Sequence, residues 1–291
     1  MHGSIALSHG VLYIGRSHKA AAIQAFDLDG RPLQPRIEFE DAVRGRSSVA
    51  GLDVDADRRV WVADDAAAKL RGFTLFGRSI AELGGGREDR LDVRGALGVP
   101  VAVRARGSDD ELVLLVASGG RRRYALQFLR PFDAGMRALP SLGDIEEPFD
   151  DLADVHWAHG RDGEPDYVLA CERRAQRLQI YRDGRFHYAV SLRGRPEAAV
   201  RLADGRFVVA LGDLDGARGA VVLLGTDGRP LRTIADASEV DHPSGLALLD
   251  GDGEGDRGTR LWIVDREGAR VQLFTLDGRG WGEFPSAIAA R

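Results

Sequence analysis

Short apolar runs recur along the chain, and each is followed by a polar break and a second apolar run. The copy from Leu261 to Gly280, LWIVDREGARVQLFTLDGRG, shows the pattern most clearly and closes at Asp277-Gly278. Runs this short predict β-strands, because apolar stretches of this length do not sustain a helical period. One run of each copy serves as an anchor: VLYIG ending at Gly15, VWVA at Ala63, VLLVA at Ala117, YVLA at Ala170, FVVA at Ala210 and LWIV at Val264.

A turn glycine follows each anchor at a steady distance. Several of these glycines come directly after an aspartate, and Asp-Gly predicts a two-residue hairpin with positive φ values. Each copy therefore predicts four short antiparallel strands. The distance is 14 or 15 residues to Gly30, Gly77, Gly184 and Gly278, and 18 residues to Gly135 and Gly228.

A four-stranded antiparallel unit that recurs at this spacing is typical of a propeller blade. Six copies predict an all-β, six-bladed β-propeller with four antiparallel strands per blade, occupying residues 1–291 as a single domain. Because Gly3 already falls in register, we expect the first blade to be complete at its own N-terminus. The ring would then close by side-chain packing between the first and last blades, helped by the tail PSAIAAR, without an exchanged strand. The expected blades are 2–39, 47–85, 98–139, 149–192, 195–234 and 242–284.

The repeat resembles the NHL family, whose blades read roughly Pro-x-Gly, apolar strand, Val-Ala-Asp, Arg-Ile/Val-Gln and Asp-Gly. The resemblance covers about residues 2–284 and implies a fold rather than an activity. The second copy keeps Gly51, Val62-Ala63-Asp64 and Arg71. The last copy carries the pattern best, in Pro243, Gly245, Val264-Asp265, Arg270-Val271-Gln272 and Asp277-Gly278.

Composition limits the classes of function. The net charge is -5, only two of the 40 basic residues are lysines, and asparagine is absent. Abundant arginine without lysine or asparagine indicates a GC-rich genome more than a nucleic-acid-binding surface, which usually carries a basic balance. No apolar run is long enough for a membrane span and the first residues lack signal-peptide features, so we expect a cytoplasmic protein. Cys171 is the only cysteine, which excludes an intramolecular disulfide and a cysteine-based zinc site.

Charged residues gather in the loops that a propeller brings to one end of its central channel, here called the mouth. These loops join second to third strands, or precede first strands. Most such residues are solvated, and Asp64 and Asp265 are expected to hold their own turns by accepting backbone hydrogen bonds. Polar residues on first strands, namely Arg104, His156 and Arg201, are expected to face the channel. The candidate ligand-binding residues are Asp64, Arg121, Glu172, Arg173, Glu197, Asp213, Asp265 and Arg266.

Metal binding is one alternative for the mouth. His18, His156 and His242 are candidate ligands for zinc or another divalent ion, with carboxylates such as Asp64 or Glu172 completing the set. The last copy resembles zinc-dependent peptidyl-hydroxyglycine lyases of the NHL type, although no tyrosine except Tyr124 falls near a mouth loop. Calcium-dependent lactonases of six-bladed form use an asparagine ligand that this chain lacks, yet carboxylates and carbonyls also bind calcium. The sequence therefore assigns no specific cofactor.

RNA binding is a further alternative, because some NHL propellers have a basic mouth. Phosphate contacts and base stacking would come from Arg121-Arg122-Arg123, Tyr124 and Arg173-Arg174. Flanking acids such as Asp64, Glu172 and Asp265 oppose this, so nucleic acid is an unlikely partner. The chain also has no Gly-x-Ser-x-Gly motif.

The sequence therefore favours a non-catalytic binding scaffold whose charged mouth takes a protein, peptide or small polar ligand. Arginines would hold anionic groups of the ligand, and carboxylates would hold cationic ones. The alternative is a metal-assisted lyase or hydrolase at the same mouth, in which His156 or His242 binds the metal and a carboxylate acts as base.

Overall fold

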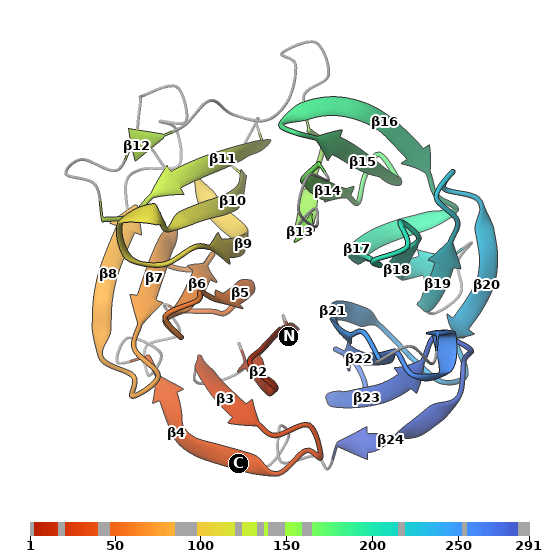
Figure 1. Cartoon of the computed structure of the whole chain (residues 1–291), viewed down its shortest axis with the longest axis horizontal. Helices are drawn as coiled ribbons and strands as arrows, with labels where there is room; N and C mark the ends of the chain where they lie inside the picture. The colour runs from red at the N-terminus through yellow and green to blue at the C-terminus, as the bar shows by residue number, and fades with distance from the viewer. Residues whose placement is uncertain are drawn as a thin grey trace.

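The protein is a ring of six blades around a central axis (Figure 1). Each blade is a four-stranded antiparallel sheet, so the predicted all-β, six-bladed propeller is confirmed. The computed structural model describes residues 3–16, 21–39, 47–84, 98–119, 124–132, 137–138, 149–158, 165–214, 219–251 and 255–284.

Each blade takes four consecutive strands of the chain. Blades 1 to 3 contain β1 (Gly3–Ser8), β2 (Val11–Arg16), β3 (Ala22–Phe26) and β4 (Pro32–Glu38); β5 (Gly51–Val54), β6 (Val60–Asp64), β7 (Lys69–Phe73) and β8 (Ser79–Gly84); and β9 (Val99–Arg106), β10 (Val113–Gly119), β11 (Tyr124–Arg130) and β12 (Arg137–Ala138). Blades 4 to 6 contain β13 (Leu152–Ala158), β14 (Tyr167–Glu172), β15 (Arg177–Arg182) and β16 (Arg185–Ser191); β17 (Gly194–Arg201), β18 (Phe207–Leu214), β19 (Ala220–Leu224) and β20 (Pro230–Ala235); and β21 (Pro243–Leu249), β22 (Arg260–Asp265), β23 (Arg270–Thr275) and β24 (Gly280–Phe284).

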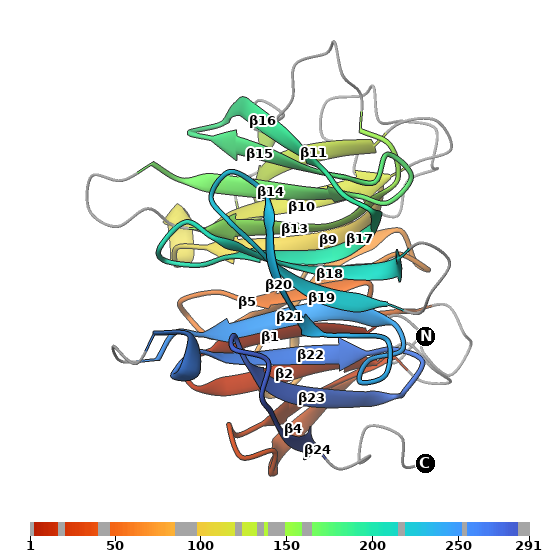
Figure 2. The ribbon, with the colours of Figure 1, turned by 90° about the vertical axis from the view of Figure 1, so that its right-hand side faces the viewer.

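The first strand of each blade lies nearest the central axis and the fourth lies on the outside, as β17 and β20 show in Figure 1. Because neighbouring strands are antiparallel, loops before first strands and loops between second and third strands lie at one end of the ring, which is the mouth. The remaining hairpins form the opposite face. Figure 2 shows the stacked strands running between these two ends.

Both faces of the second strands are buried between neighbouring blades, which explains why these strands read as continuous apolar runs. In β6, Val60 and Val62 pack against blade 1, whereas Trp61 and Ala63 pack against blade 3. Side chains alternate between the two faces of a strand, so one run of apolar residues fills two interfaces.

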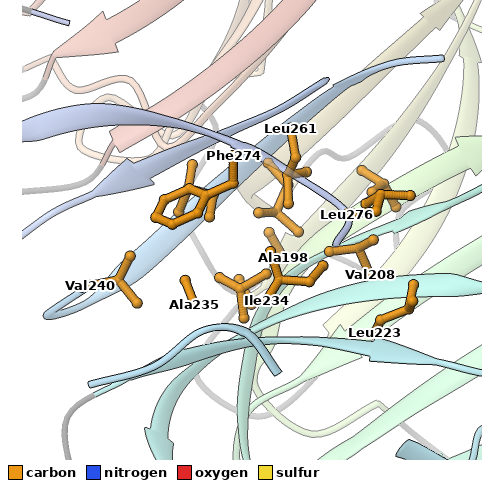
Figure 3. Packing of buried hydrophobic residues seen from close by; sticks show 14 of the residues in the cluster. Ala198, Val208, Leu223, Ile234, Ala235, Val240, Leu261, Phe274 and Leu276 are labelled. Atoms are coloured by element: carbon orange, nitrogen blue, oxygen red, sulfur yellow. The ribbon is translucent and has the colours of Figure 1, made fainter. Parts of the chain in front are cut away.

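Six clusters of buried apolar side chains make up the core, one at each contact between neighbouring blades. Figure 3 shows the cluster between blades 5 and 6, where Val208 and Leu223 face Leu261 and Phe274 from the next blade. The lone cysteine, Cys171, belongs to the cluster between blades 4 and 5 and is 1% exposed. Burial raises the pKa of its thiol well above the ordinary value, so it serves packing.

The ring closes without strand exchange, as the sequence predicts. All four strands of blade 1 come from one continuous N-terminal segment. Ile5 and Ile14 of blade 1 pack against Trp262 and Val264 of blade 6 in a shared cluster. The expected help from the tail PSAIAAR falls outside the described residues.

The prediction of two-residue hairpins is correct at one Asp-Gly site and wrong at three. Asp183 and Gly184 both have positive φ, 48° and 77°, between the paired Arg182 and Arg185. At the other three sites the loop has three residues. Such a loop is a type I turn followed by a left-handed glycine, and it needs only one positive φ. Equivalent hydrogen bonds define these loops: Gly30 N–H to Asp27 O, Gly228 N–H to Gly225 O and Gly278 N–H to Thr275 O, and the same turn occurs at Gly77 N–H to Thr74 O.

The residues that the structure describes contain no long helix. No helix of these residues is long and apolar enough to cross a membrane. The two short 3-10 turns, Asp109–Glu111 and Gly255–Arg257, lie between first and second strands on the face opposite the mouth. The turn predicted at Gly135 falls outside the described residues.

Candidate functional site

The carboxylate of Asp64, at the end of β6, is fully buried beside the mouth. Its Oδ1 accepts the backbone N–H of Ser48 at 2.9 Å and of Ala67 at 3.0 Å. Its Oδ2 lies 3.0 Å from Nε of Arg71. A buried carboxylate is stable only when its oxygens are occupied in this way. Asp64 therefore joins the loop before β5, the β6–β7 turn and strand β7.

Glu172 and Asp265 repeat this arrangement in blades 4 and 6, and both are fully buried. Glu172 accepts the N–H of Asp150 at 2.7 Å and Nε of Arg177 at 2.5 Å. Asp265 accepts the N–H groups of Asp241, His242 and Gly268, and its Oδ2 lies 3.2 Å from Nε of Arg270. The chain itself thus occupies the oxygens of these three candidates.

The residue after the buried acid is an arginine in blades 4 and 6. Arg173 follows Glu172, and its N–H donates to the carbonyl of Asp151 at 3.0 Å. Arg266 follows Asp265, and its N–H donates to the carbonyl of His242 at 2.9 Å. Matching backbone bonds make Arg173 and Arg266 equivalent positions two blades apart. Both side chains stay partly exposed, at 26% and 21%.

Glu197, on β17 of the intervening blade, lies between these two arginines. Nε and Nη2 of Arg173 lie 2.9 and 2.8 Å from its Oε2. Its Oε1 lies 3.9 Å from Nε2 of His242, which in turn is 2.9 Å from Nη2 of Arg266. Charged and polar groups from blades 4, 5 and 6 therefore form one continuous row, called here the rim row: Arg173, Glu197, His242 and Arg266.

The bond between Arg266 and His242 fixes the role of the imidazole. A guanidinium can only donate, so Nε2 of His242 accepts this hydrogen bond and the ring proton sits on Nδ1. Nε of Arg266 is buried and has no hydrogen-bond partner among the described residues, and the carboxylate of Glu267 is 3.9 Å away. Arg266 therefore retains donor capacity at the rim.

Arg173 is held in its charged form. Burial alone would lower the pKa of this guanidinium, but the hydrogen bond to Glu197 and the negative charges of Glu197 and Asp151 raise it on balance. The row continues toward blade 3 through Asp151, whose Oδ1 accepts the hydroxyl of Tyr124 at 3.4 Å. Burial and the charge of Asp151 raise the pKa of Tyr124, which keeps its proton on the donating hydroxyl.

A second charged group lies on the innermost strands below the mouth. Nη2 of Arg104, on β9, contacts both oxygens of Asp154 on β13 at 2.9 and 3.2 Å. Asp53, on β5, accepts the N–H of Ala105 at 2.8 Å. Burial raises the pKa of Asp53 and of Asp154, and the charge of Arg104 opposes the shift in both. Arg104 thus links blades 3 and 4 near the axis, and the hydrogen bond from Ala105 to Asp53 links blade 3 to blade 2.

The predicted first-strand polar residues have different surroundings. Arg104 bridges blades, as described, and Arg201 lies 4.0 Å from the ring centre of Tyr167 in the neighbouring blade. His156 is half-buried in β13, four residues further from the mouth than Leu152, which pairs with Glu172. Neither Arg201 nor His156 belongs to the rim row.

The remaining sequence candidates divide by position. Arg121 and His18 lie outside the described residues, and Asp213 is described only by its backbone in β18. No group of three or more His, Cys, Asp or Glu side chains suited to a metal ion occurs in the described part of the chain. His242 and His156 are therefore not combined in such a group.

Sequence reasoning missed three contributors to the site. Gly212, on β18, approaches Glu197 so closely that a Cβ there would lie 2.9 Å from Oε1. Asp53 and Asp154 interrupt otherwise apolar first strands, and this break in the apolar pattern is the signal that identifies them. No comparable pattern marks Gly212, because its role depends on a neighbouring strand.

The fold and the rim row define a six-bladed β-propeller with charged side chains at one end of its channel. Among solved structures, virginiamycin B lyase from Staphylococcus aureus is similar, with a TM-score of 0.60 and 14% identity over 97% of this chain and 83% of that one. BBS1N, solved in complex with ARL6DN, has a TM-score of 0.57 and 14% identity over 92% and 75%. A Bacteroides caccae protein of unknown function has a TM-score of 0.57 and 13% identity over 84% and 85%.

At such low identity these similarities establish the fold alone. No family model matches the chain, and no curated protein matches it by sequence. The NHL likeness therefore remains a resemblance in motif and architecture.

Proposed function

We propose that the protein is a non-catalytic binding propeller that takes an acidic segment of a protein or peptide at its rim row. The observation that supports this most directly is the arrangement around Glu197. Arg173 contacts that carboxylate directly, and Arg266 bonds to His242, whose Nε2 lies 3.9 Å from the other carboxylate oxygen.

Arg266 is the side chain best placed to hold an incoming anion. Arg173 already makes two contacts to the carboxylate of Glu197, whereas Arg266 bonds to the imidazole of His242 and its side chain is 21% exposed. A guanidinium binds a carboxylate with two parallel hydrogen bonds, so an Asp or Glu side chain or a chain terminus fits this position. Glu197 and Asp151 would interact with cationic groups beside it.

A protein partner also agrees with the fold. Propellers present wide, rigid surfaces made of loops from several blades, and the similar BBS1N propeller was solved in complex with another protein. That partner belongs to BBS1N and does not transfer to this chain.

A peptide array tests the proposal with a matched control. Wild-type protein is expected to retain peptides enriched in Asp or Glu, and Arg266→Ala is expected to lose them, because the anion loses its donor. Arg229→Ala removes an arginine that is 86% exposed on the β19–β20 hairpin, on the opposite face, and should bind as wild type does. Equal loss in both variants, or no acidic preference in wild type, would contradict the proposal.

A further inference from the structure

A cavity of about 140 Å³ lies between blades 1 and 2 on the face opposite the mouth. Its wall is mainly apolar and includes Tyr13 on β2, Ala25 on β3 and Leu75 on the β7–β8 hairpin. The polar side chain of Arg58, in the β5–β6 turn, also lines it. The cavity shares no residue with the rim row.

The cavity lies where blade 1 has Tyr13 at the position that Trp61 occupies in blade 2. Tyr13 pairs with Ala25, just as Trp61 pairs with Gly72, and both aromatic residues face the next blade. Between blades 2 and 3 the indole fills the interface so fully that a Cβ on Gly72 would lie 2.8 Å from its ring. Tyr13 with Ala25 leaves the corresponding space between blades 1 and 2 open.

Two adjacent arginines at this face have different surroundings. Arg59 contacts Asp55 at 2.7 Å, Asp57 at 2.6 Å and Asp109 at 3.4 Å. Arg58 is exposed, and among the described residues no carboxylate lies within ion-pair distance of it. Its charge acts on the hydroxyl of Tyr13, where it opposes the increase in pKa that burial causes. The guanidinium therefore lines the cavity without an ion-pair partner among the residues that the structure describes.

We propose that this cavity binds a small apolar carboxylate, such as an aromatic or branched aliphatic acid, with its carboxylate on Arg58. The volume supports the size class, since engineered apolar cavities of about 150 Å³ bind benzene. The charge supports the acid, because Arg58 offers a planar set of donors to a carboxylate. The side chains of Tyr13, Ala25 and Leu75 would contact the apolar part.

Benzoate is the probe for this proposal, titrated into the full chain by calorimetry and followed by NMR. We expect saturable binding at one site. Arg58→Asn should weaken it about tenfold, the loss expected for one charge-assisted contact. Asn suits this position because Arg58 has a φ of 60°, and Asn tolerates the left-handed region. Ala25→Leu should abolish binding by filling the cavity.

Three controls distinguish a specific site from damage or nonspecific association. Arg229→Asn changes an arginine in a hairpin on the same face without touching the cavity, and should bind benzoate as wild type does. Ala25→Leu should unfold at a temperature no lower than wild type, because it fills empty space. Benzyl alcohol, which keeps the ring but lacks the charge, should bind about tenfold more weakly than benzoate.

The proposal is overturned if benzoate does not bind wild type, or if its affinity survives both Arg58→Asn and Ala25→Leu. It is also overturned if benzyl alcohol binds as tightly as benzoate, because the arginine would then have no role. The mouth and its acidic peptides are not involved in any of these measurements.

Discussion

Asp265 and Glu197 are both acidic residues at the mouth of neighbouring blades, yet their surroundings differ. Asp265 is fully buried, and its oxygens contact three backbone N–H groups and Arg270. Glu197 is 6% exposed; Arg173, which is itself partly exposed, donates to its Oε2, and Nε2 of His242 lies 3.9 Å from its Oε1. Backbone partners make a carboxylate part of the fold, whereas partly exposed side-chain partners leave it able to exchange them.

The comparison separates two roles that residue type alone does not distinguish. Asp64, Glu172 and Asp265 hold the loops in place, and the rim row stands on those loops. The buried acids thus determine where Arg173 and Arg266 lie, because each arginine follows directly after one of them. The predictions below test this division.

The largest expected effect is the loss of stability in Asp265→Ala. The substitution removes the acceptor of several buried N–H groups and leaves Arg270 without its carboxylate. Breaking a buried ion pair from one side costs about 3 to 5 kcal/mol. Urea unfolding should show this decrease in the free energy of unfolding. A loss below about 1 kcal/mol would contradict the structural role.

Gly268→Ala should disturb the same carboxylate without removing it. A Cβ at Gly268 would lie 2.6 Å from Oδ2 of Asp265 and 2.9 Å from Nε of Arg270. Overpacking in such a site costs about 1 to 3 kcal/mol. Thermal and urea unfolding would measure it, and a variant as stable as wild type would show that the turn adapts freely.

Gly212→Ala is the matched change at Glu197, and it should affect binding more than stability. The new Cβ would lie 2.9 Å from Oε1 of Glu197 and displace that carboxylate from Arg173. Glu197 has a longer side chain than Asp265 and no backbone partner to lose among the described residues, so the expected loss of stability is about 1 kcal/mol or less. Peptide-array binding should fall in Gly212→Ala. Intact binding together with a large loss of stability would reverse the comparison.

The smallest effect concerns pH and the channel carboxylate Asp154. Burial raises its pKa above the ordinary value of 3.8, against the opposing charge of Arg104. A group with a raised folded-state pKa contributes stability below its unfolded value and loses that contribution as pH rises through the folded value. Asp154→Asn cannot titrate there. Its stability relative to wild type should therefore improve as the pH rises from below 3.8 toward neutrality, as measured by urea unfolding across that range.

Much of the architecture could be predicted because it follows from local patterns. Apolar runs buried on both faces, as in Val60 to Ala63, and regular turn glycines identify strands and blades without tertiary information. The length of the turns could not be predicted this way. Asp29-Gly30 and Asp183-Gly184 are the same dipeptide, but the first lies in a three-residue loop and the second forms a two-residue loop. The lengths differ because the flanking strands pair in different registers.

The site was predicted less completely, since a mouth collects residues from separate blades. The sequence placed Arg173, Glu197, His242 and Arg266 among the candidates for this region, but it could not place them in one row. The sequence also could not distinguish a carboxylate whose oxygens are occupied by backbone N–H groups from one that contacts only side chains. Glu172 and Glu197 look alike until the backbone around each is known. The proposed roles of the rim row in binding stay predictions.

The packing of Trp262 and Val264 on Ile5 and Ile14 also sets an order for folding. Contacts between successive blades join segments near in sequence, whereas this one joins residues separated by most of the chain, and closing so large a loop costs the most entropy. During synthesis the apolar side of the first sheet therefore stays uncovered until the last one has emerged. This uncovered apolar surface of the first blade is where a nascent chain of this kind is most prone to aggregate and where a chaperone would protect it.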